Sequence, residues 1–130
     1  MALRHNTHRS DPSTILVVED DPVTRELYRV ALTAGGNVVI AVRDGVDALR
    51  VMEQRQPAAV VLDLSLPGLS GADVAQEMSA QPPLSAVPII IVTGDASGID
   101  PTRFACVLHK PINPADLIDA VTRCLSTSSR

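Results

Sequence analysis

Four groups of polar residues in this sequence each stand at the end of an apolar run. Glu19-Asp20-Asp21 follow one run, and Asp63 ends a second. Thr93-Gly94 ends a third, and Lys110, the single lysine of the chain, follows a fourth in the stretch LHKPINP. Together they offer carboxylates, one hydroxyl and one ammonium, which are groups that bind cations and anionic ligands.

The acidic residues of this set have different interpretations. Asp21 stands before Pro22, a pattern typical of a helix N-cap, so we interpret Asp21 as a cap rather than as a reacting group. The case for capping is weaker at Asp20 and Asp63, and an ionised carboxylate at the end of an apolar strand needs a partner. Clustered carboxylates repel one another unless a cation lies among them, and hard oxygen ligands with open positions suit Mg²⁺.

The apolar runs and the stretches between them predict the elements that position these residues. Strands are expected at 14–18, 37–42, 58–64, 87–95 and 104–110. Helices are expected after Asp21, over 43–56, from Ser70 to about Ala80, and from the Asn113 cap onward. This alternation indicates an α/β fold, with a doubly wound, five-stranded parallel sheet and helices on both faces. Ligands of such sheets bind outside the carboxyl ends of the strands, so the four polar groups are expected to share one edge.

Three of the helices carry apolar stripes that are expected to face the core. In the first helix the stripe is Leu27, Val30, Ala31 and Ala34. In the second helix it is Val46, Leu49 and Met52. In the last helix it is Leu117, Ile118, Val121 and Leu125.

Length and composition place the chain among ordinary globular domains. Of its 130 residues 45% are hydrophobic but only 2% aromatic, so the core must be aliphatic, as suits a parallel sheet. The net charge of −4 shows no basic surface for nucleic acid. Cys106 and Cys124 form no CxxC motif, which favours reduced thiols in a cytoplasmic protein. Without a membrane-length apolar run or a signal peptide, we expect one domain at 13–126 between tails at 1–12 and 127–130.

The four motifs, taken in order, resemble the response-regulator receiver domain of two-component signal transduction. The matching stretches are ILVVEDDP, VVLDLSLPGLSG, VPIIIVTGD and LHKPI, and the resemblance runs from about Thr14 to Ser126. Asp63 lies 43 residues after Asp20, and Thr93 lies 30 residues after Asp63, spacings that also fit the family. The resemblance implies a flavodoxin-like sheet with strand order 2-1-3-4-5.

The resemblance assigns the acidic residues to one reaction. Asp63 matches the aspartate that accepts a phosphoryl group. Glu19 and Asp20 match the acidic pair that holds Mg²⁺ or Mn²⁺ together with Asp63, and Asp20 is expected to be the direct ligand of the pair. Ser65 matches the position whose backbone carbonyl completes the metal site.

The resemblance also gives roles to the residues at the ends of the last two strands. Thr93 matches the hydroxyl that bonds a phosphoryl oxygen. Lys110 matches a lysine that pairs with the acceptor aspartate or with the phosphoryl group, as a compact ammonium on a flexible stem can do. The Lys110–Pro111 peptide resembles one that is cis in the family, and X-Pro bonds adopt the cis form at low cost. Residues expected to modulate the reaction are Ser65, Gly94, Asp95 and Val107.

Two features depart from the family. The position three residues before the lysine, commonly Tyr or Phe, is Val107, and Phe104 is not an obvious substitute. We expect Val107 to pack in its strand and backbone movement to carry the switch signal. Lys110 lies only 17 positions after Thr93, which leaves too little chain for a full fourth helix. We therefore expect a fourth helix that is short or absent, with one turn at most near Asp100-Pro101, and a groove there for a partner or another subunit.

The function implied by the resemblance is a phosphoacceptor switch that a partner reads, rather than an enzyme. Its phosphohistidine donor is a histidine kinase or a histidine phosphotransfer protein, and its own chemistry is limited to self-phosphorylation and self-dephosphorylation. A homodimer is left open, whereas direct nucleic acid or membrane binding is not expected. The alternatives are a degenerate receiver acting as a constitutive interaction module and, less favoured, an Asp-nucleophile phosphohydrolase. A nucleotide-binding domain is disfavoured because the G-x-G-x-x-G and Walker patterns are absent.

Overall fold

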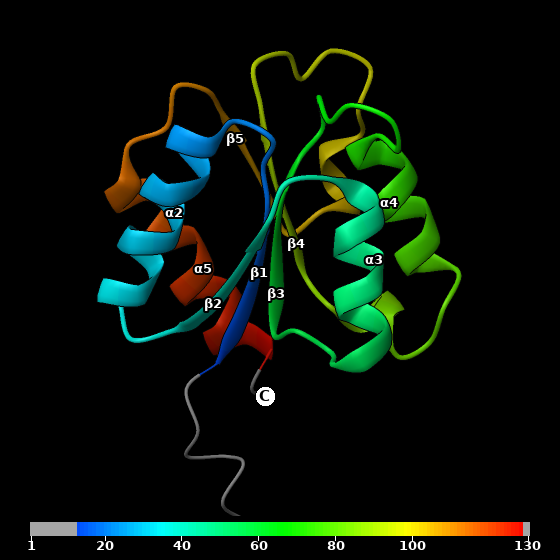
Figure 1. The fold of residues 1–130 in the computed structure, drawn as a ribbon, viewed down its shortest axis with the longest axis horizontal. Helices are drawn as coiled ribbons and strands as arrows, with labels where there is room; N and C mark the ends of the chain where they lie inside the picture. Colours follow the sequence, from blue (N-terminus) through cyan, green and yellow to red (C-terminus); the bar gives the residue numbers. More distant parts are fainter. Residues whose placement is uncertain (1–12, 129–130) are drawn as a thin grey trace, which may run out of the picture.

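A computed structural model describes residues 13–128, and these form one parallel sheet covered by helices (Figure 1). The strands are β1 (Thr14–Val18), β2 (Val38–Val42), β3 (Ala59–Asp63), β4 (Ile89–Thr93) and β5 (Cys106–His109). The α-helices are α2 (Pro22–Ala34), α3 (Gly45–Gln54), α4 (Gly71–Ser79) and α5 (Pro114–Ser128), and the 3₁₀ turns are η1 (Leu84–Ala86) and η2 (Pro101–Arg103). The strand order is β2-β1-β3-β4-β5, which confirms the predicted fold class.

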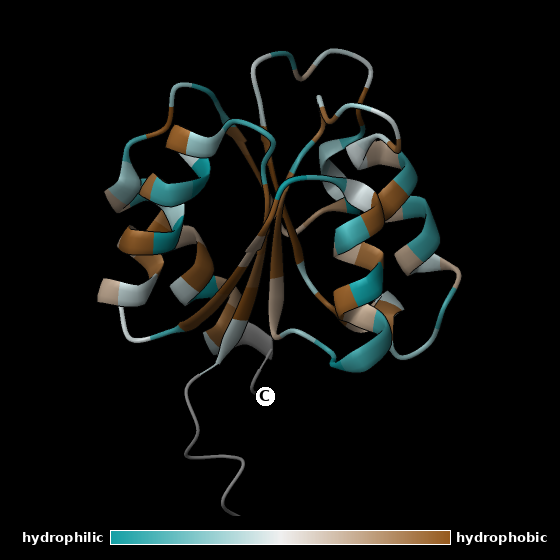
Figure 2. Ribbon diagram, in the orientation of Figure 1, coloured by the Kyte–Doolittle hydropathy of each residue, from teal (hydrophilic) through white to brown (hydrophobic). Residues whose placement is uncertain are grey.

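The helices divide between the two faces of the sheet. α2 and α5 cover one face, at the left of Figure 1, while α3 and α4 cover the other. Colouring by hydropathy shows mostly brown strands between helices that carry both brown and teal residues (Figure 2). β3 is buried along its whole length, because side chains on both of its faces meet a helical layer.

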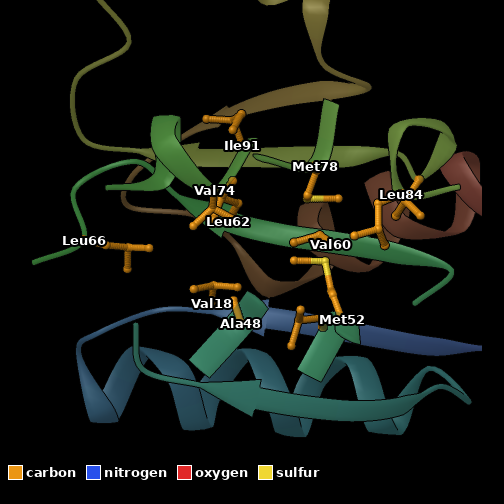
Figure 3. Packing of buried hydrophobic residues seen from close by; sticks show 12 residues of the cluster. Val18, Ala48, Met52, Val60, Leu62, Leu66, Val74, Met78, Leu84 and Ile91 are labelled. Carbon is orange, nitrogen blue, oxygen red and sulfur yellow. The ribbon is translucent and has the colours of Figure 1, made fainter. Parts of the chain in front are cut away.

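One apolar cluster lies on each face of the sheet. The cluster beneath α3 and α4 joins alternate residues of the strands to the helices, as Val18, Leu62, Val74 and Met78 show in Figure 3. The cluster beneath α2 and α5 includes Tyr28, the single tyrosine of the chain. The two layers hold the sheet rigidly from both sides and therefore fix the positions at which its strands end.

The strand register brings the ends of the strands to a common edge. Val18 pairs with Leu62 between β1 and β3, so Glu19 and Asp63 follow neighbouring positions. Thr93 pairs with His109 between β4 and β5, so Lys110 lies just beyond Thr93. This is the upper edge of the sheet in Figure 1, and it is the edge at which the polar groups were expected.

The helices begin at side-chain caps close to this edge. Asp21 accepts a hydrogen bond from the Thr24 backbone N–H at 2.9 Å, as expected for the cap of α2. Ser70 caps α4 in a capping box with Asp73. After β1 the chain turns within three residues and returns as α2, whereas the longer loop 64–70 separates β3 from α4.

The crossover between β4 and β5 contains no α-helix. Its one helical segment is η2, which Asp100 caps through the Thr102 backbone N–H at 3.0 Å. This confirms the expected absence of a full fourth helix. Ile99 and Phe104 pack against the cluster beneath α3 and α4 instead. A groove of about 510 Å³ runs between the crossover and α4, with Met78 and Leu84 among its lining residues.

The predicted core face of two helices is partly wrong. In α2, Leu27 and Val30 are 46% and 51% exposed, whereas Tyr28 and Leu32 are buried. In α3, Val46 is exposed although Met52 is buried as expected. The true inward stripes are rotated because the sheet and the neighbouring helix, rather than the count of apolar residues, determine which side is covered.

The ends of the chain differ from the sequence-based boundaries in one respect. α5 continues to Ser128, so residues 127 and 128, expected in the C-terminal tail, belong to the helix. The predicted tail at 1–12 and residues 129–130 lie outside the described residues. Among residues 13–128, no helix is long and apolar enough to cross a membrane.

Candidate functional site

Three carboxylates gather at the carboxyl edge of the sheet. Glu19 and Asp20 follow β1, Asp63 ends β3, and one oxygen of each lies within 4.8 Å of the others. Glu19 and Asp63 are 1% and 3% exposed, whereas Asp20 is open to solvent. The cluster therefore has a buried floor and one carboxylate at its mouth. Hard oxygen donors at this spacing, with one side open to water, fit a Mg²⁺ or Mn²⁺ ion.

Lys110 bridges the two buried carboxylates. Its Nζ donates to Glu19 Oε1 at 2.8 Å and to Asp63 Oδ2 at 3.0 Å. Burial of the ammonium opposes its charge, but the bonds to Glu19 and Asp63 outweigh burial and raise the pKa of Lys110 above its ordinary value. The ammonium therefore stays charged and offsets one of the two buried negative charges.

In Glu19 the effect of burial on the pKa outweighs that of the hydrogen bonds. Burial raises its pKa above the ordinary value of 4.5, and the negative charge of Asp63 acts in the same direction. The hydrogen bonds from Lys110 and from the Asp21 backbone N–H, the latter at 3.1 Å, lower the pKa but do not cancel the effect of burial. A second cation in the cluster would therefore relieve an unfavourable buried charge.

The Asp63 carboxylate is held through both of its oxygens. Oδ1 accepts the backbone N–H of Ser65 at 2.9 Å, and Oδ2 accepts the Lys110 ammonium. These two bonds fix the plane of the carboxylate at the end of β3. Ser65 contacts Asp63 through its backbone N–H. That the backbone carbonyl of Ser65 is a metal ligand stays a prediction.

Thr93 lies at the end of β4 with its hydroxyl turned toward the crossover. Thr93 Oγ1 donates to the Asp95 carbonyl at 2.9 Å and accepts the Asp95 backbone N–H at 3.1 Å. Asp95 in turn accepts the Ser97 hydroxyl and backbone N–H, and these bonds lower the pKa of Asp95. The side chain of Thr93 is fully buried, while Gly94 beside it is exposed. The hydroxyl is thus tied to the first residues of the crossover.

The remaining predicted residues lie in β5 or directly after it. The Lys110 backbone N–H donates to the Thr93 carbonyl at 2.7 Å, which links the two strand ends. The Lys110–Pro111 peptide is cis. Val107 is half-buried and packs against the cluster beneath α3 and α4, so it lies with the core rather than with the acidic residues.

Two residues close to the site escaped the sequence-based interpretation. Arg25 donates from one guanidinium nitrogen to the carbonyls of Glu19 and Asp20. Gly71, the first residue of α4, lies so close to the Asp63 carbonyl that an added Cβ would clash with it. A basic residue five positions after an acidic pair and a glycine after a cap are weak signals, because each is common in sequences without such contacts.

The fold and the site together define a class of protein. A five-stranded parallel sheet in the order 2-1-3-4-5 is the flavodoxin-like arrangement, and ligands of such sheets bind at the carboxyl edge, where the acidic cluster lies. The response regulator receiver domain family matches residues 15–122, and the chain belongs to that family.

Several individual proteins resemble this chain. It is 28% identical over 115 residues to the polar-differentiation response regulator DivK of Brucella anthropi, a match that covers 85% of this chain and 94% of DivK. It is 33% identical over 112 residues to the DNA-binding response regulator MtrA of Mycolicibacterium smegmatis, covering 82% of this chain and 48% of MtrA. The chain therefore spans about half the length of MtrA.

A solved structure gives a similar match. The receiver domain of sensor histidine kinase PA1611 from Pseudomonas aeruginosa PAO1 is 32% identical, with a TM-score of 0.81 over 88% of this chain and 98% of that one. In that structure a magnesium ion is coordinated in the active-site cleft. The Vibrio cholerae chemotaxis protein CheY4, at 23% identity and a TM-score of 0.81, shares the fold over 88% of this chain and 99% of its own.

Proposed function

We propose that this receiver domain is a phosphoacceptor switch in which Asp63 accepts a phosphoryl group from a phosphohistidine. The observation that carries the proposal is the state of the Asp63 carboxylate. It is buried at the end of β3, is held by the Ser65 N–H and the Lys110 ammonium, and adjoins Glu19 and Asp20. A carboxylate fixed in this way is oriented for attack on phosphorus.

In the proposed reaction an oxygen of the Asp63 carboxylate attacks phosphorus in line with the phosphorus–nitrogen bond of the donor. The new oxygen–phosphorus bond forms as the old bond breaks, and the imidazole leaves with the bonding electrons and takes up a proton. The product is an acyl phosphate on Asp63. Catalysis then consists of positioning and of stabilising the charge on the transferring group.

The same residues that hold the carboxylate would receive the phosphoryl group. Glu19, Asp20 and Asp63, with the Ser65 carbonyl, would hold Mg²⁺ or Mn²⁺, which supplies positive charge against the carboxylates and the phosphoryl oxygens. Lys110 is within reach of Asp63 and would pair with a phosphoryl oxygen. The Thr93 hydroxyl would bond another after leaving Asp95. Gly94 and Asp95 stand beside that hydroxyl, and together with Ser65 they are proposed to set the lifetime of the acyl phosphate.

The signal is proposed to travel through the backbone of the crossover. The Thr93 hydroxyl binds the main chain of Asp95, so its movement toward Asp63 would release the first residues of the crossover. Val107 provides no aromatic ring whose rotation could report the change. A partner that contacts the crossover would therefore read its backbone conformation.

The proposed donor is a histidine kinase or a histidine phosphotransfer protein in the cytoplasm. The family supports this proposal, because receiver domains work with such donors in two-component systems. Among the similar structures, one is the receiver domain of a sensor histidine kinase. Under the proposal, this chain supplies the acceptor and the switch rather than turnover of a substrate.

A second candidate function follows from the groove beside the crossover. A receiver domain that binds a partner constitutively needs an interaction surface but no phosphoryl transfer, and the groove of about 510 Å³ offers such a surface. The two proposals differ in whether the acceptor residues are needed. A degenerate receiver would function without them, whereas the phosphoacceptor switch requires Asp63.

The deciding experiment is the intact mass of the protein after incubation with Mg²⁺ and acetyl phosphate. We expect the parent protein to gain one phosphoryl group and Asp63→Asn to gain none. Asp119→Asn is the matched control, because Asp119 is an exposed aspartate on α5, and it should gain as much as the parent. Equal gain in Asp63→Asn would remove Asp63 from the proposal. If the parent gains nothing from either acetyl phosphate or a phosphorylated histidine phosphotransfer protein, the constitutive module is favoured.

A further inference from the structure

The side chain of Arg25 closes the turn from which the acidic pair projects. We propose that Arg25 is a positioning residue for the metal site: it fixes the backbone of Glu19 and Asp20 so that their carboxylates stand together for Mg²⁺. The inference rests on the proposed function, because it assumes that the acidic cluster holds this ion. It gives a task to a cation that the reaction scheme does not otherwise use.

The contacts of Arg25 are with backbone rather than with carboxylates. Its NH1 nitrogen donates to the Glu19 carbonyl at 2.9 Å and to the Asp20 carbonyl at 3.3 Å. One guanidinium nitrogen thus holds two consecutive peptide units at the point where β1 ends. A planar guanidinium presents its donors in a fixed geometry, so it constrains two acceptors better than a flexible single donor does.

These two peptide units carry the metal-binding side chains. Glu19 is anchored on its other side because its N–H donates to the Val42 carbonyl at 3.0 Å, in continuation of the β1–β2 ladder. Asp20 is exposed, and its backbone N–H and carbonyl lie beyond the end of β1. The hydrogen bond from Arg25 therefore constrains the Asp20 carbonyl. Asp20 is the residue of the pair that is proposed to bind the metal directly.

The place of Arg25 in its helix supports a local role. It is the fourth residue of α2, and a cation near a helix N-terminus opposes the helix dipole. Its bonds to the two carbonyls provide compensation for that unfavourable position. Arg29, one turn further on, has a different arrangement, because its Nε and NH2 nitrogens pair with the exposed carboxylate of Glu26.

Two roles for Arg25 predict changes of opposite sign in Mg²⁺ affinity. If Arg25 acted only as a nearby positive charge, its removal would lessen repulsion and tighten Mg²⁺ binding. If it positions the acidic pair, its removal would loosen the turn and weaken binding. Partners that orient metal ligands typically change metal affinity by about 10–100-fold when they are removed. The sign of the change therefore distinguishes the two roles.

The test is calorimetric titration of Mg²⁺ into the parent protein, Arg25→Met, Arg25→Lys and Arg29→Met. Arg25→Met keeps an apolar stem and loses the donors, and we expect its Kd for Mg²⁺ to rise about 10–100-fold. Arg25→Lys keeps the charge and a donor, so its Kd for Mg²⁺ should lie between those of Arg25→Met and the parent. Arg29→Met removes the same charge from the same helix and should stay within about twofold of the parent, since an exposed charge is screened.

The second readout is the rate of phosphorylation by acetyl phosphate as a function of Mg²⁺ concentration. A positioning role predicts that Arg25→Met needs more Mg²⁺ but approaches the parent rate at saturation. An Arg25→Met protein that binds Mg²⁺ as tightly as the parent, or more tightly, would overturn the inference and leave the phosphoacceptor function standing if the parent is phosphorylated. A parent that binds no Mg²⁺ would overturn both. If circular dichroism shows that Arg25→Met does not fold, Arg25→Gln takes its place, because it also loses the charge and the guanidinium. A folded Arg25→Gln variant that binds Mg²⁺ as tightly as the parent would overturn the inference.

Discussion

The Glu19 carboxylate carries a buried charge that its hydrogen bonds compensate only in part. It is buried beside Asp63, and the two share one ammonium, that of Lys110. Burial raises its pKa, so the folded protein binds a proton at Glu19 more readily than the unfolded chain does. The free energy of unfolding of the metal-free protein should therefore decrease as pH rises from about the ordinary Glu pKa of 4.5 through the raised value.

Glu19→Gln should remove this part of the pH dependence. In EDTA the variant should be more stable than the parent at neutral pH, by roughly 1 kcal/mol for each unit by which the pKa of Glu19 is raised. Thermal unfolding in EDTA between pH 4 and pH 8 measures the difference. Lys110 does not interfere, because its raised pKa means that it loses its proton only far above this range.

The control for that experiment is Glu53→Gln, which changes an exposed glutamate of α3. It should leave the pH profile of the parent unchanged. A Glu19→Gln profile that runs parallel to the parent profile would show that the burial of Glu19 does not govern acid stability.

Most of the residues at the site could be located from the sequence because strand ends in a parallel sheet share an edge. Glu19, Asp63, Thr93 and Lys110 each follow an apolar run, and the register does bring them to one edge. The partners of these side chains could not be located in this way. The bond of Thr93 to Asp95, and that of Arg25 to two carbonyls, depend on rotamers and loop geometry that residue order does not determine.

Among the elements, α4 supports the acceptor most directly. Its first residue, Gly71, donates its N–H to the Leu64 carbonyl at 3.3 Å. A Cβ at Gly71 would lie 2.7 Å from the Leu64 Cα and would also clash with the Asp63 carbonyl. The helix can therefore approach the end of β3 only because this position lacks a side chain.

Gly71→Ala should push α4 away from the end of β3. We expect a loss of about 1–3 kcal/mol in the free energy of unfolding, as for other overpacked sites. Phosphorylation of Asp63 should also slow, because the added methyl displaces the backbone that carries it. Urea unfolding and the mass assay measure the two effects.

Gly94→Ala is the control for stability, since an added Cβ there would meet no atom within 4 Å. It should unfold at nearly the same urea concentration as the parent. Equal stability of Gly71→Ala and the parent would mean that α4 can shift without strain, contrary to the close contact seen here.

Element positions followed from the sequence more closely than helix orientation did. β1 has the predicted bounds, and β4 is shorter than predicted at both ends because only the residues that pair with β3 and β5 form the ladder. In α2, apolar residues occur on two sides of the helix. Contact with α5 and the sheet buries Tyr28 and Leu32 and leaves Leu27 and Val30 exposed. The spacing of apolar residues alone could not predict which of the two apolar sides of α2 faces the core.

At the scale of the whole molecule, the acidic cluster couples ion binding to stability. A ligand that binds the native state alone stabilises it by about 2.7 kcal/mol when present at 100 times its Kd. For a domain of this size that corresponds to a rise in Tm of about 10 °C. Differential scanning calorimetry with MgCl₂ or with NaCl at equal ionic strength should show this rise with MgCl₂ alone.

Asp20→Asn should lose most of that stabilisation, because it removes the exposed carboxylate at the mouth of the cluster. The folded structure of the variant should otherwise be unaffected, since the Asp20 side chain is open to solvent. An identical Mg²⁺-dependent rise in Asp20→Asn would place the stabilising ion elsewhere on the molecule.

The single lysine of the chain gives the molecule an unusual analytical property. Lys110 carries the chain's one ε-amine, it is 28% exposed, and it lies between two carboxylates at the site. Reductive methylation with ¹³C-formaldehyde would therefore introduce one side-chain probe, without any mutation. Its NMR signal would report directly which anions surround the nitrogen, in a spectrum free of overlap from other lysine side chains.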